Sequence, residues 1–478
     1  MSGLPKGWQS SSLDKIVPHD ATISDGDWVE SKDQDPNGTV RLIQLADIGD
    51  GNFRNKSQRF MNNEAACRLN CSFLKEGDLL VARMPDPLGR ACLFPGIGQN
   101  AVTVVDVCFI RETSISAISN TLLKHWFNSP YIRGVISANA SGSTRKRITR
   151  KKLEKFEFPV PPLAEQKRIV KKLDEVLAQV DTIKARLEGI PDLLKRFRQS
   201  VLAAAVSGKL TEEWRGDTKQ AAERTLNLPQ SWQLKSANEV CSKVQSGSTP
   251  RNDPFNQNGT VPFLKVYNIV NQEIDFDYKP QFVTTETHAD KLKRSIAYPG
   301  DVLMNIVGPP LGKVAIVTTQ YPEWNLNQAI TLFRANDELL NNKYLYYVLC
   351  EGALVRDVMP ETKGSVGQVN ISLTQCRESK VPLPSLDEQK EIVRLVDQYF
   401  AFADTIEAQV KKAQARVDNL TQSILAKAFR GELVPQDPND EPADKLLERI
   451  AQARADAEAL AKAAKKAENA KKRAAKKS

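Results

Sequence analysis

One amphipathic segment occurs twice in this chain. Residues 162–185 read PLAEQKRIVKKLDEVLAQVDTIKA, and residues 385–408 read SLDEQKEIVRLVDQYFAFADTIEA. The triplet Glu-Gln-Lys at 165–167 returns at 388–390, which is an offset of 223 positions. Self-similarity at a fixed offset constrains the fold strongly, because both copies are expected to form the same structure. The sequence therefore predicts two related halves.

The repeat extends into the parts of the chain that precede each copy. Short motifs return there at the same offset or within one residue of it, while the sequence between them diverges. Each half is therefore predicted to consist of a globular domain followed by a helical region. The matched motifs are Leu4 to Trp8 with Leu228 to Trp232, Gly77-Asp78 with Gly300-Asp301, Pro87 to Arg90 with Pro310 to Lys313, Arg133 with Arg356, and Ile148-Thr149 with Ile371-Ser372.

Within each copy, apolar residues are spaced alternately by four and three positions. This is the a/d pattern of a helix that packs along another helix. Prolines precede both copies, and Gly208 and Gly431 follow them, so each helix should begin after the prolines and end before the glycine. The second helix should run from about 386 to 429 and be roughly 60 Å long, whereas Pro191 predicts a kink or a break in the first. The predicted helix seam consists of Ile169, Leu173, Val176, Val180, Ile183 and Leu187 in the first copy and of Ile392, Val396, Tyr399, Ile406, Val410, Val417 and Leu420 in the second.

The globular domains are predicted to mix strands and helices. Short runs rich in β-branched residues lie between glycines and prolines, as is typical of strands. Two apolar runs near the ends of the globular parts indicate helices. The predicted strands are 40–48, 78–83, 101–110, 261–269, 301–307 and 313–317, and the predicted helices are 121–129 and 343–351.

Composition restricts the class of protein and its location. Of the 478 residues, 41% are hydrophobic and 26% are charged, as in soluble globular proteins. No stretch approaches the ~18 apolar residues of a membrane span, and the start, MSGLPKGWQ, lacks the features of a secretory signal, so a cytoplasmic protein is expected. Residues 461–478 contribute +7 of the net charge of +9, so charge alone does not indicate nucleic-acid binding.

Motifs for catalysis or metal binding are not found in the sequence. The seven cysteines form no CxxC pair, and with only three histidines present they are expected to be reduced thiols rather than zinc ligands. The segment 308–313, GPPLGK, is one residue short of a phosphate-binding loop and has prolines where amide donors are needed, so a strand-to-strand turn is predicted. His125 lies in an apolar helical run and is expected to be a packed or an interface histidine. The chain is therefore predicted to have no active site and no metal of its own.

Two long stretches carry a family resemblance. Residues 161–214, from PPLAEQKRIV to SGKLTEEW, resemble the central conserved region of specificity subunits of type I restriction–modification enzymes. Residues 385–434, from SLDEQKEIV to FRGELV, resemble their distal conserved region. The opening LPKGW and the Ala/Lys-rich end are similar to the enterobacterial type of these subunits. The resemblance runs from end to end, except in the two variable globular domains.

The resemblance implies a DNA reader that is not itself an enzyme. In that family two target-recognition domains each read one half of a bipartite, asymmetric double-stranded DNA target. The helical regions set the spacing and dock two modification subunits, which bind S-adenosylmethionine and methylate adenine. Restriction subunits that translocate and cut DNA join with ATP and Mg²⁺. The resemblance thus implies no cofactor in this chain and no membrane partner.

The expected fold belongs to the α+β class. It comprises two mixed α/β target-recognition domains in a pseudo-two-fold repeat, separated by two long antiparallel coiled-coil helical spacer regions. The expected segments are a first target-recognition domain at 1–158, a central spacer at 159–215, a second target-recognition domain at 216–381, a distal spacer at 382–434 and a basic Ala/Lys-rich tail at 435–478.

Basic residues beside predicted turns are the candidates for DNA contact. The run Ser141–Lys152 is the most basic loop of the first half, and its counterpart at 361–370 is polar but nearly uncharged. Phosphate contacts position a protein on DNA, whereas arginine can read guanine with two hydrogen bonds. A solvated face and salt bridges flanking the core are the alternatives. The candidates are Arg83, Arg90, Arg145, Lys146 and Arg147 in the first half and Arg251, Lys313 and Lys363 in the second.

Two other functions are compatible with the pattern. A coiled-coil scaffold could bind other proteins through its globular ends, and a fused nuclease could carry an unrecognised site. Retention of a bipartite duplex with a steep salt dependence would separate a DNA reader from a scaffold. Failure of the chain alone to cut or methylate DNA would exclude the enzyme.

Overall fold

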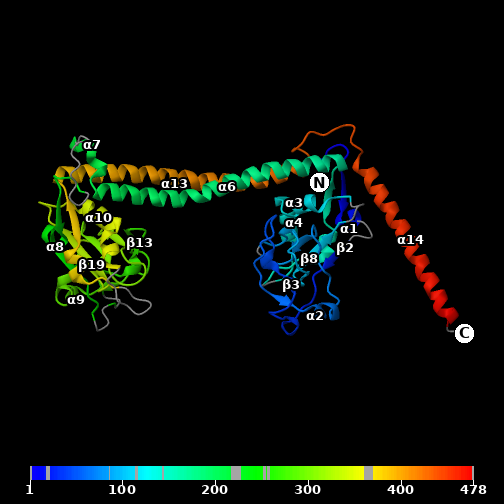
Figure 1. Ribbon diagram of the computed structural model, residues 1–478, viewed down its shortest axis with the longest axis horizontal. Helices are drawn as coiled ribbons and strands as arrows, with labels where there is room; N and C mark the ends of the chain where they lie inside the picture. Colours follow the sequence, from blue (N-terminus) through cyan, green and yellow to red (C-terminus); the bar gives the residue numbers. More distant parts are fainter. Residues whose placement is uncertain are drawn as a thin grey trace. The chain divides into compact units, whose positions relative to one another are not determined.

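The computed structural model describes residues 3–17, 22–85, 87–112, 117–142, 145–216, 228–250, 255, 259–359 and 370–475 (Figure 1). The chain forms two compact units, Met1–Arg186 with Lys412–Ser478, and Leu187–Lys411. Each unit contains one head, meaning its sheets and short helices, together with a part of each of two long helices. The units therefore differ from the consecutive segments expected from the sequence, because the long helices are divided between them.

The long helices are α6 (Leu163–Val206, 44 residues) and α13 (Leu386–Ala428, 43 residues). The bounds of α13 agree with the sequence prediction. α6 continues through Pro191, so the expected break does not occur. Gly208 lies beyond the end of α6 with a φ of 75°, the left-handed conformation that suits a glycine after a helix.

Within each unit the two helices pack against each other in antiparallel orientation (Figure 1). In the first unit Lys184 Nζ lies 2.8 Å from Asp418 Oδ1, and in the second Arg198 Nη2 lies 2.6 Å from Asp404 Oδ1. The residue number thus rises along α6 as it falls along α13. A proline inside a helix removes one backbone hydrogen bond. Contacts to α13 on both sides of Pro191 explain why α6 continues through it.

The predicted helix seam is buried only in part. Near the start of α6 the seam also faces the head, since Ile169 and Leu173 share a core with Trp126 of the head. A seven-residue repeat drifts by ~20° per heptad around a straight helix, so parts of the seam leave the contact line. Ile169, Leu173, Val180, Ile392, Val396 and Val410 are buried, Val176, Leu187, Ile406 and Val417 are half-buried, and Ile183, Tyr399 and Leu420, contrary to expectation, are exposed.

The main sheets of the two heads have the same arrangement although the sequences differ, and among the described residues the second head has one additional two-stranded sheet, β13-β14. The strands of the first unit are β1 (Gln9–Ser12), β2 (Thr22–Asp25), β3 (Val40–Ile43), β4 (Phe60–Met61), β5 (Leu79–Ala82), β6 (Ala91–Leu93), β7 (Ala101–Thr103), β8 (Val107–Arg111) and β9 (Glu157–Val160). Those of the second are β10 (Gln233–Ser236), β11 (Cys241–Ser246), β12 (Val261–Leu264), β13 (Ile269–Val270), β14 (Glu273–Ile274), β15 (Phe282–Val283), β16 (Val302–Asn305), β17 (Val314–Ile316), β18 (Asn325–Leu326), β19 (Ile330–Ala335) and β20 (Lys380–Leu383).

Each head contains a four-stranded and a three-stranded sheet. Their strand orders are β2-β8-β5-β6 and β4-β3-β7 in the first head, and β11-β19-β16-β17 and β15-β12-β18 in the second. In the three-stranded sheets β3 pairs with β7 and β12 with β18 in parallel. β1 pairs with β9, and β10 pairs with β20, as separate antiparallel ladders. Mixed sheets and helices in both heads confirm the predicted fold class.

The predicted strands form, with two differences. The segment 101–110 gives β7 and β8 instead of one strand, because Val107 N donates a hydrogen bond to Val104 O and turns the chain. The segments 40–48 and 261–269 each begin as a strand and continue into a 3₁₀ turn, η2 (Leu45–Asp47) and η5 (Val266–Asn268). The segment 308–313 connects the antiparallel strands β16 and β17, which confirms the predicted turn.

Short helices complete the heads, and two of them, α3 and α10, match the predicted runs. Both begin at a side-chain cap, Ser119 for α3 and Asn341 for α10, whose oxygen accepts a hydrogen bond from the first turn. The helices of the first head are α1 (Leu13–Ile16), α2 (Asn63–Arg68), α3 (Asn120–Phe127), α4 (Pro130–Asn139) and α5 (Arg150–Glu154). Those of the second are α8 (Ala237–Val240), α9 (Thr285–Ala289), α10 (Asn342–Glu351), α11 (Ala353–Val358) and α12 (Leu373–Glu378).

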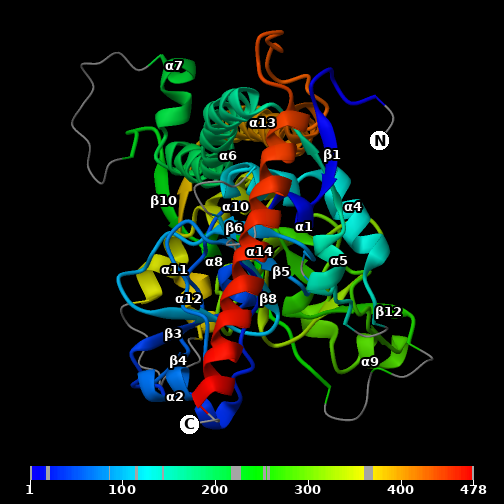
Figure 2. The same cartoon turned by 90° about the vertical axis from the view of Figure 1, so that its right-hand side faces the viewer.

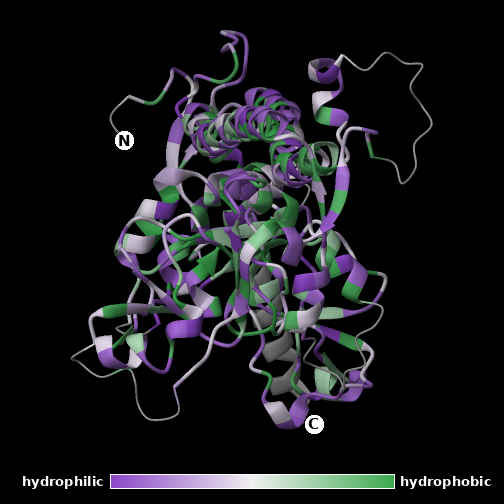
Figure 3. Ribbon diagram, turned by 90° about the vertical axis from the view of Figure 1, so that its left-hand side faces the viewer, coloured by the Kyte–Doolittle hydropathy of each residue, from purple (hydrophilic) through white to green (hydrophobic). Residues whose placement is uncertain are grey.

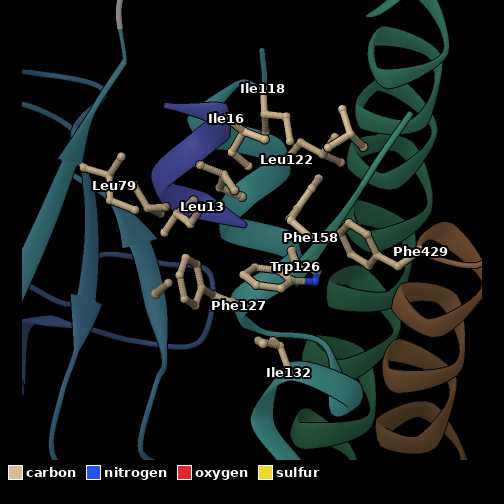
Figure 4. Packing of buried hydrophobic residues seen from close by; sticks show 14 of the residues in the cluster. Leu13, Ile16, Leu79, Ile118, Leu122, Trp126, Phe127, Ile132, Phe158 and Phe429 are labelled. Atoms are coloured by element: carbon tan, nitrogen blue, oxygen red, sulfur yellow. The ribbon is translucent and has the colours of Figure 1, made fainter. Parts of the chain in front are cut away.

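The core of the first unit gathers residues from the head and from both long helices (Figure 4). The Trp126 ring lies edge to face with the rings of Phe127 and Phe158, with centroid distances of 5.1 and 4.9 Å. Phe158 also contacts Phe429, just after α13, at 6.1 Å. Such aromatic pairs add about 0.5–1.5 kcal/mol each beyond the burial of their area. The first head and its helices therefore share one core.

The last helix, α14 (Ala443–Ala475), begins as part of the first unit (Figure 2). Ala443, Leu446 and Ile450 are buried in the same core. Arg454 Nη2 donates hydrogen bonds to the carbonyl oxygens of Asp14 and Val17. The segment 435–478, expected to be a tail, thus contributes to packing as far as Arg454.

The long helices are amphipathic. The end-on view coloured by hydropathy shows both hydrophilic and hydrophobic residues in the pair of long helices (Figure 3). Such a pattern lets one face pack while the other remains in water. Among the helices that the structure describes, none is long and apolar enough to cross a membrane.

Candidate nucleic-acid interface and head–helix joints

Two backbone hydrogen bonds join the two sides of the basic loop of the first head. Ser141 and Arg147 exchange these bonds with N···O distances of 2.9 and 2.8 Å. Arg145 and Lys146 are exposed, whereas Arg147 is half-exposed and places its Nη2 3.4 Å from the carbonyl oxygen of Val105. Arg145 and Lys146 are therefore placed where a phosphate backbone can reach them, and Arg147 supports the turn.

Corresponding loops are tied to both heads at the same point. In the first head Ile148 N donates to Arg83 O at 3.1 Å, and in the second Ile371 N donates to Ile306 O at 2.9 Å. Both partners in the second head are displaced by 223 positions from those in the first. The two heads thus hold the ends of these loops in the same way, although the loop sequences differ.

Arg83 and Arg90 are buried inside the first head. Arg83 Nη1 lies 2.7 Å from Asp25 Oδ1. Arg90 donates hydrogen bonds to the carbonyl oxygens of Ile48 and Leu45, both at 2.7 Å. The expectation that these two arginines enter a DNA groove finds no support, because their guanidinium groups hold parts of the head together. The structure favours the alternative of bonds within and around the core.

The second head offers fewer candidates among the residues that the structure describes. Lys313 is half-buried directly before β17, and its backbone N donates to Asn305 Oδ1 at 2.6 Å. Arg251 and Lys363 lie outside the described residues. In this head the candidate DNA-contacting loop is located by the hydrogen bond from Ile371 N to Ile306 O and by the sequence repeat.

Each head contains an Arg–Asp ion pair that was not among the predicted site residues. Arg111 binds Asp78 with distances of 2.9 and 2.5 Å, and Arg334 binds Asp301 with distances of 2.8 and 2.6 Å. Both carboxylates are buried, and two-point pairs of this kind are strong and fix the orientation of both groups. The sequence signal for this ion pair is the shared offset: the aspartates of the repeated Gly-Asp motif and the two arginines are each separated by 223 positions.

The repeated Glu-Gln pair lies where each head joins its long helix. Glu165 Oε2 accepts a hydrogen bond from Trp8 Nε1 at 2.9 Å, and Glu388 Oε2 accepts one from Trp232 Nε1 at 3.0 Å. Each tryptophan directly precedes a strand, β1 or β10, that pairs with the strand leading into the helix. Each glutamate thus fastens the start of its head to the first turn of the helix.

The glutamine of each pair makes a second contact at the joint. Its side-chain amide donates to one carbonyl oxygen of the head and to one in the proline turn before the helix. These contacts give the repeated Glu-Gln pair the same role in both joints. The hydrogen bonds run from Gln166 Nε2 to Ala117 O at 2.8 Å and Pro161 O at 3.0 Å, and from Gln389 Nε2 to Leu339 O at 2.9 Å and Pro384 O at 3.0 Å.

The two joints differ at the second carboxylate oxygen. Glu388 Oε1 accepts a hydrogen bond from Thr211 Oγ1 at 2.7 Å and is paired with Arg215, the last residue of α7 (Glu212–Arg215). Glu165 Oε1 is buried and has no hydrogen-bond partner among the residues that the structure describes. Burial raises the pKa of the Glu165 carboxyl above its ordinary value. One joint therefore contains a paired charge and the other an unpaired carboxylate oxygen.

The two histidines that the structure describes are buried, and each lies near a carboxylate. His125 is buried in α3 with Nε2 3.7 Å from Asp174 Oδ1, and burial lowers its pKa to about 3. This confirms the prediction of a packed histidine. His288 is buried with Nε2 3.0 Å from Glu323 Oε2. In the described ranges of the chain, no cluster of three or more His, Cys, Asp or Glu residues is arranged to hold a metal ion.

Comparison with known families identifies the repeat. A family model described as the type I restriction modification DNA specificity domain matches this chain twice, over residues 5–192 and 229–414. Each match contains one head and the larger part of the following long helix. The family model therefore recognises the same two halves that the 223-residue offset predicts.

Several curated relatives are specificity subunits. The type I restriction enzyme EcoBI specificity subunit of Escherichia coli is 38% identical over 313 residues, which cover 64% of this chain and 65% of that protein. The EcoKI specificity subunit of E. coli K12 is 36% identical over 67% of each chain, and the EcoDI specificity subunit of E. coli is 35% identical over 72% of this chain and 78% of that protein. The chain thus spans about two thirds of the length of the first two relatives.

Solved structures share the fold. A structure on the complex assembly and conformational transition of the type I R-M system matches with a TM-score of 0.64 at 20% identity, over 90% of this chain and all of that one. The crystal structure of an HsdS subunit from Thermoanaerobacter tengcongensis matches with a TM-score of 0.56 at 22% identity, over 90% of this chain and 98% of that one. Fold, family model and curated relatives agree: this chain belongs to the family of type I restriction–modification specificity subunits.

Proposed function

We propose that this chain reads a bipartite double-stranded DNA target, one half-site with each head, and so gives a type I restriction–modification complex its sequence specificity. The observation that carries this proposal is the duplicated architecture: two heads have the same strand order, and each is fastened to a long helix by the same Glu-Gln joint. Two heads in one chain form a pseudo-dimer whose halves can differ. This arrangement suits an asymmetric target.

The DNA contacts of the first head centre on the exposed turn with Arg145 and Lys146. These side chains would contact phosphates, which position a protein without reading sequence. In the second head the corresponding contacts are assigned to Lys313, Arg251 and Lys363. Other residues of the heads would then contact the bases, because Arg83 and Arg90 bind groups within the first head.

The long helices serve as the spacer between the two half-sites. α6 and α13 are each shared by both units. Half-sites that lie on the same side of the duplex are separated by about 10 bp, or one helical turn. The length of the paired helices would then select the spacer of the target.

The exposed apolar side chains of the long helices are the proposed docking sites for two modification subunits. In the second unit Phe402 is 59% exposed and Tyr399 is 40% exposed, and both lie beside Phe197. Exposed apolar patches on a soluble protein mark partner surfaces. The partner subunits would bind S-adenosylmethionine, ATP and Mg²⁺ and perform the chemistry in the cytoplasm, while this chain is not catalytic.

The test is a map of methylated adenines in cells that carry this chain with the modification subunits of its own system. The expected result is one bipartite, asymmetric motif that disappears when this chain is deleted. Exchange of residues 1–158 for the first head of a related subunit should change one half of the motif and leave the other half and the spacer unchanged. A motif that survives the deletion, or a change in both halves after the exchange, would overturn the proposal.

A further inference from the structure

We propose that Arg215 is a positioning residue that acts through Glu388 and Trp232. It fixes the orientation of the second head on α13, and thereby the spacer that the complex accepts. This inference rests on the proposed function, because a spacer exists only if two heads read two half-sites. It assigns a role to a residue that lies far from the candidate DNA-contacting loops of its head in the sequence.

One guanidinium group connects three parts of the second unit. Arg215 Nη1 is paired with Glu388 on α13 and donates to Thr211 Oγ1 at 2.9 Å. Its Nη2 donates to Gly208 O at 2.6 Å, at the corner that follows α6. Its Cζ lies 5.8 Å from the centre of the Trp232 ring, which leads into the head strand β10. Movement of the head against either helix would break at least one of these contacts.

The corner that holds Arg215 is tightly built. Gly208 has a φ of 75°, and a Cβ at this position would lie 2.4 Å from Pro229 Cγ and 3.3 Å from Arg215 Nη1. The side chain of Arg215 is only 8% exposed. The guanidinium group is therefore confined by its neighbours, as a group must be if it is to set an orientation.

The first unit shows that the joint can form without this network. The residues at the repeat-related positions of Thr211 and Arg215 are Val434 and Pro438, whose side chains cannot donate a hydrogen bond. Glu165 nevertheless keeps its bond to a tryptophan, and the head still packs on its helices. The network around Arg215 is thus an addition to a joint that already folds. This separates its positioning role from a requirement for folding.

The experiment measures the spacer distribution of methylated targets in cells that carry the full complex. Three variants of this chain are compared with the wild type: Arg215→Ala, Arg215→Lys and Thr211→Val. Arg215→Ala should raise methylation at targets whose spacer differs by one base pair by about fivefold, with both half-sites unchanged. Thr211→Val should shift the distribution less and in the same direction. Arg215→Lys should shift the distribution to an extent between Arg215→Ala and the wild type, because it keeps a charge beside Glu388 but cannot make all the contacts of the guanidinium group.

A matched control removes an arginine from the same unit without touching the joint. Arg394 on α13 is 59% exposed in its side chain and pairs with Glu391 at 2.7 Å. Arg394→Ala should leave the spacer distribution unchanged. Any effect of Arg215→Ala then belongs to the joint rather than to the loss of one positive charge.

The possible results separate this inference from the proposed function. An active Arg215→Ala complex with the wild-type spacer distribution would overturn the positioning role. If Arg215→Ala leaves no active complex, Thr211→Val decides, and a wild-type distribution in that variant would overturn the inference. Wild-type cells without a bipartite motif would instead overturn the proposed function.

Discussion

Replacing the repeated glutamate by glutamine in each joint should have opposite effects in the two units. Glu165→Gln and Glu388→Gln are the same chemical change at repeat-related positions. In both variants the new side-chain oxygen can still accept the tryptophan N–H bond. The outcome therefore depends on the second carboxylate oxygen, which is unpaired in Glu165 and paired with Thr211 and Arg215 in Glu388.

The magnitudes follow from burial and pairing. The side chains of Arg215 and Glu388 are only 8% and 3% exposed, so Glu388→Gln removes a negative charge that lies against a buried guanidinium group. Removing one partner of such a pair costs about 3–5 kcal/mol. A buried polar group without a partner costs about 1–3 kcal/mol. Glu165→Gln removes the negative charge from such a group, so it should be neutral or stabilise the first joint by up to this amount.

The first joint should also depend on pH in a defined direction. Burial raises the pKa of Glu165, so the folded joint binds the proton more tightly than the opened joint does. The contribution of this proton to stability is complete below the ordinary glutamate pKa of about 4.3 and is lost as the pH rises through the raised value. Arg168 and Asp440, paired at 2.6 Å, are the other charged groups near this carboxyl. Glu165→Gln should remove the pH-dependent loss and leave their ion pair intact.

Amide hydrogen exchange of the full chain in its complex can measure both joints at once. Peptides that contain β1 report the first joint, and peptides that contain β10 report the second. After correction for intrinsic exchange between pH 5 and pH 8, Glu388→Gln should accelerate exchange in β10, whereas Glu165→Gln should slow exchange in β1 at the upper end of this range. Equal acceleration in both joints would refute the reasoning from unequal pairing.

Three further predictions concern DNA, spacer and partner. Replacing Arg145 and Lys146 by Ala should reduce the slope of log affinity against log salt concentration by roughly 2, as measured by filter binding of the complex to DNA. As a control, Lys32→Ala should leave this slope unchanged, because Lys32 is an exposed lysine paired with Glu30 at 2.7 Å. Inserting four residues in α6 after Arg186 adds about 6 Å of helix and should lengthen the spacer by about one or two base pairs. Two inserted residues would instead rotate the seam by about 200° and should abolish methylation. Phe402→Ala should weaken assembly with the modification subunits by more than about 1 kcal/mol, measured by titration calorimetry, without altering the methylated motif.

The periodic parts of the fold were predictable because each prediction used only local spacing. α13 has the expected bounds, and the turn at 308–313 joins two strands as expected. Of the kink or break predicted at Pro191, the break does not occur, since the local cost of a proline is outweighed by contacts of α6 to α13 on both sides of it. A rule for one helix cannot include the neighbour that keeps the helix continuous.

The candidate DNA residues show where sequence reasoning is insufficient. Arg83, Arg90 and Arg145 are all basic residues beside turns, but the first two are buried and only Arg145 is exposed. Two of the partners of Arg90 are the carbonyl oxygens of Leu45 and Ile48, more than forty positions earlier in the chain. A backbone carbonyl carries no sequence signal. The direction of an arginine that such carbonyls bind is therefore visible only in the folded structure.

The joints show the same limit in a repeated motif. Glu165 and Glu388 are identical in type, position and tryptophan partner, yet their second oxygens have different surroundings. The difference arises because the partners of Glu388 come from the segment after α6, whereas the segment after α13 places Val434 and Pro438 at the related positions. Duplication thus conserves the fastening of the head, while the flanking segments determine its charge. A chain whose heads read different half-sites can in this way also hold its two heads with different strength.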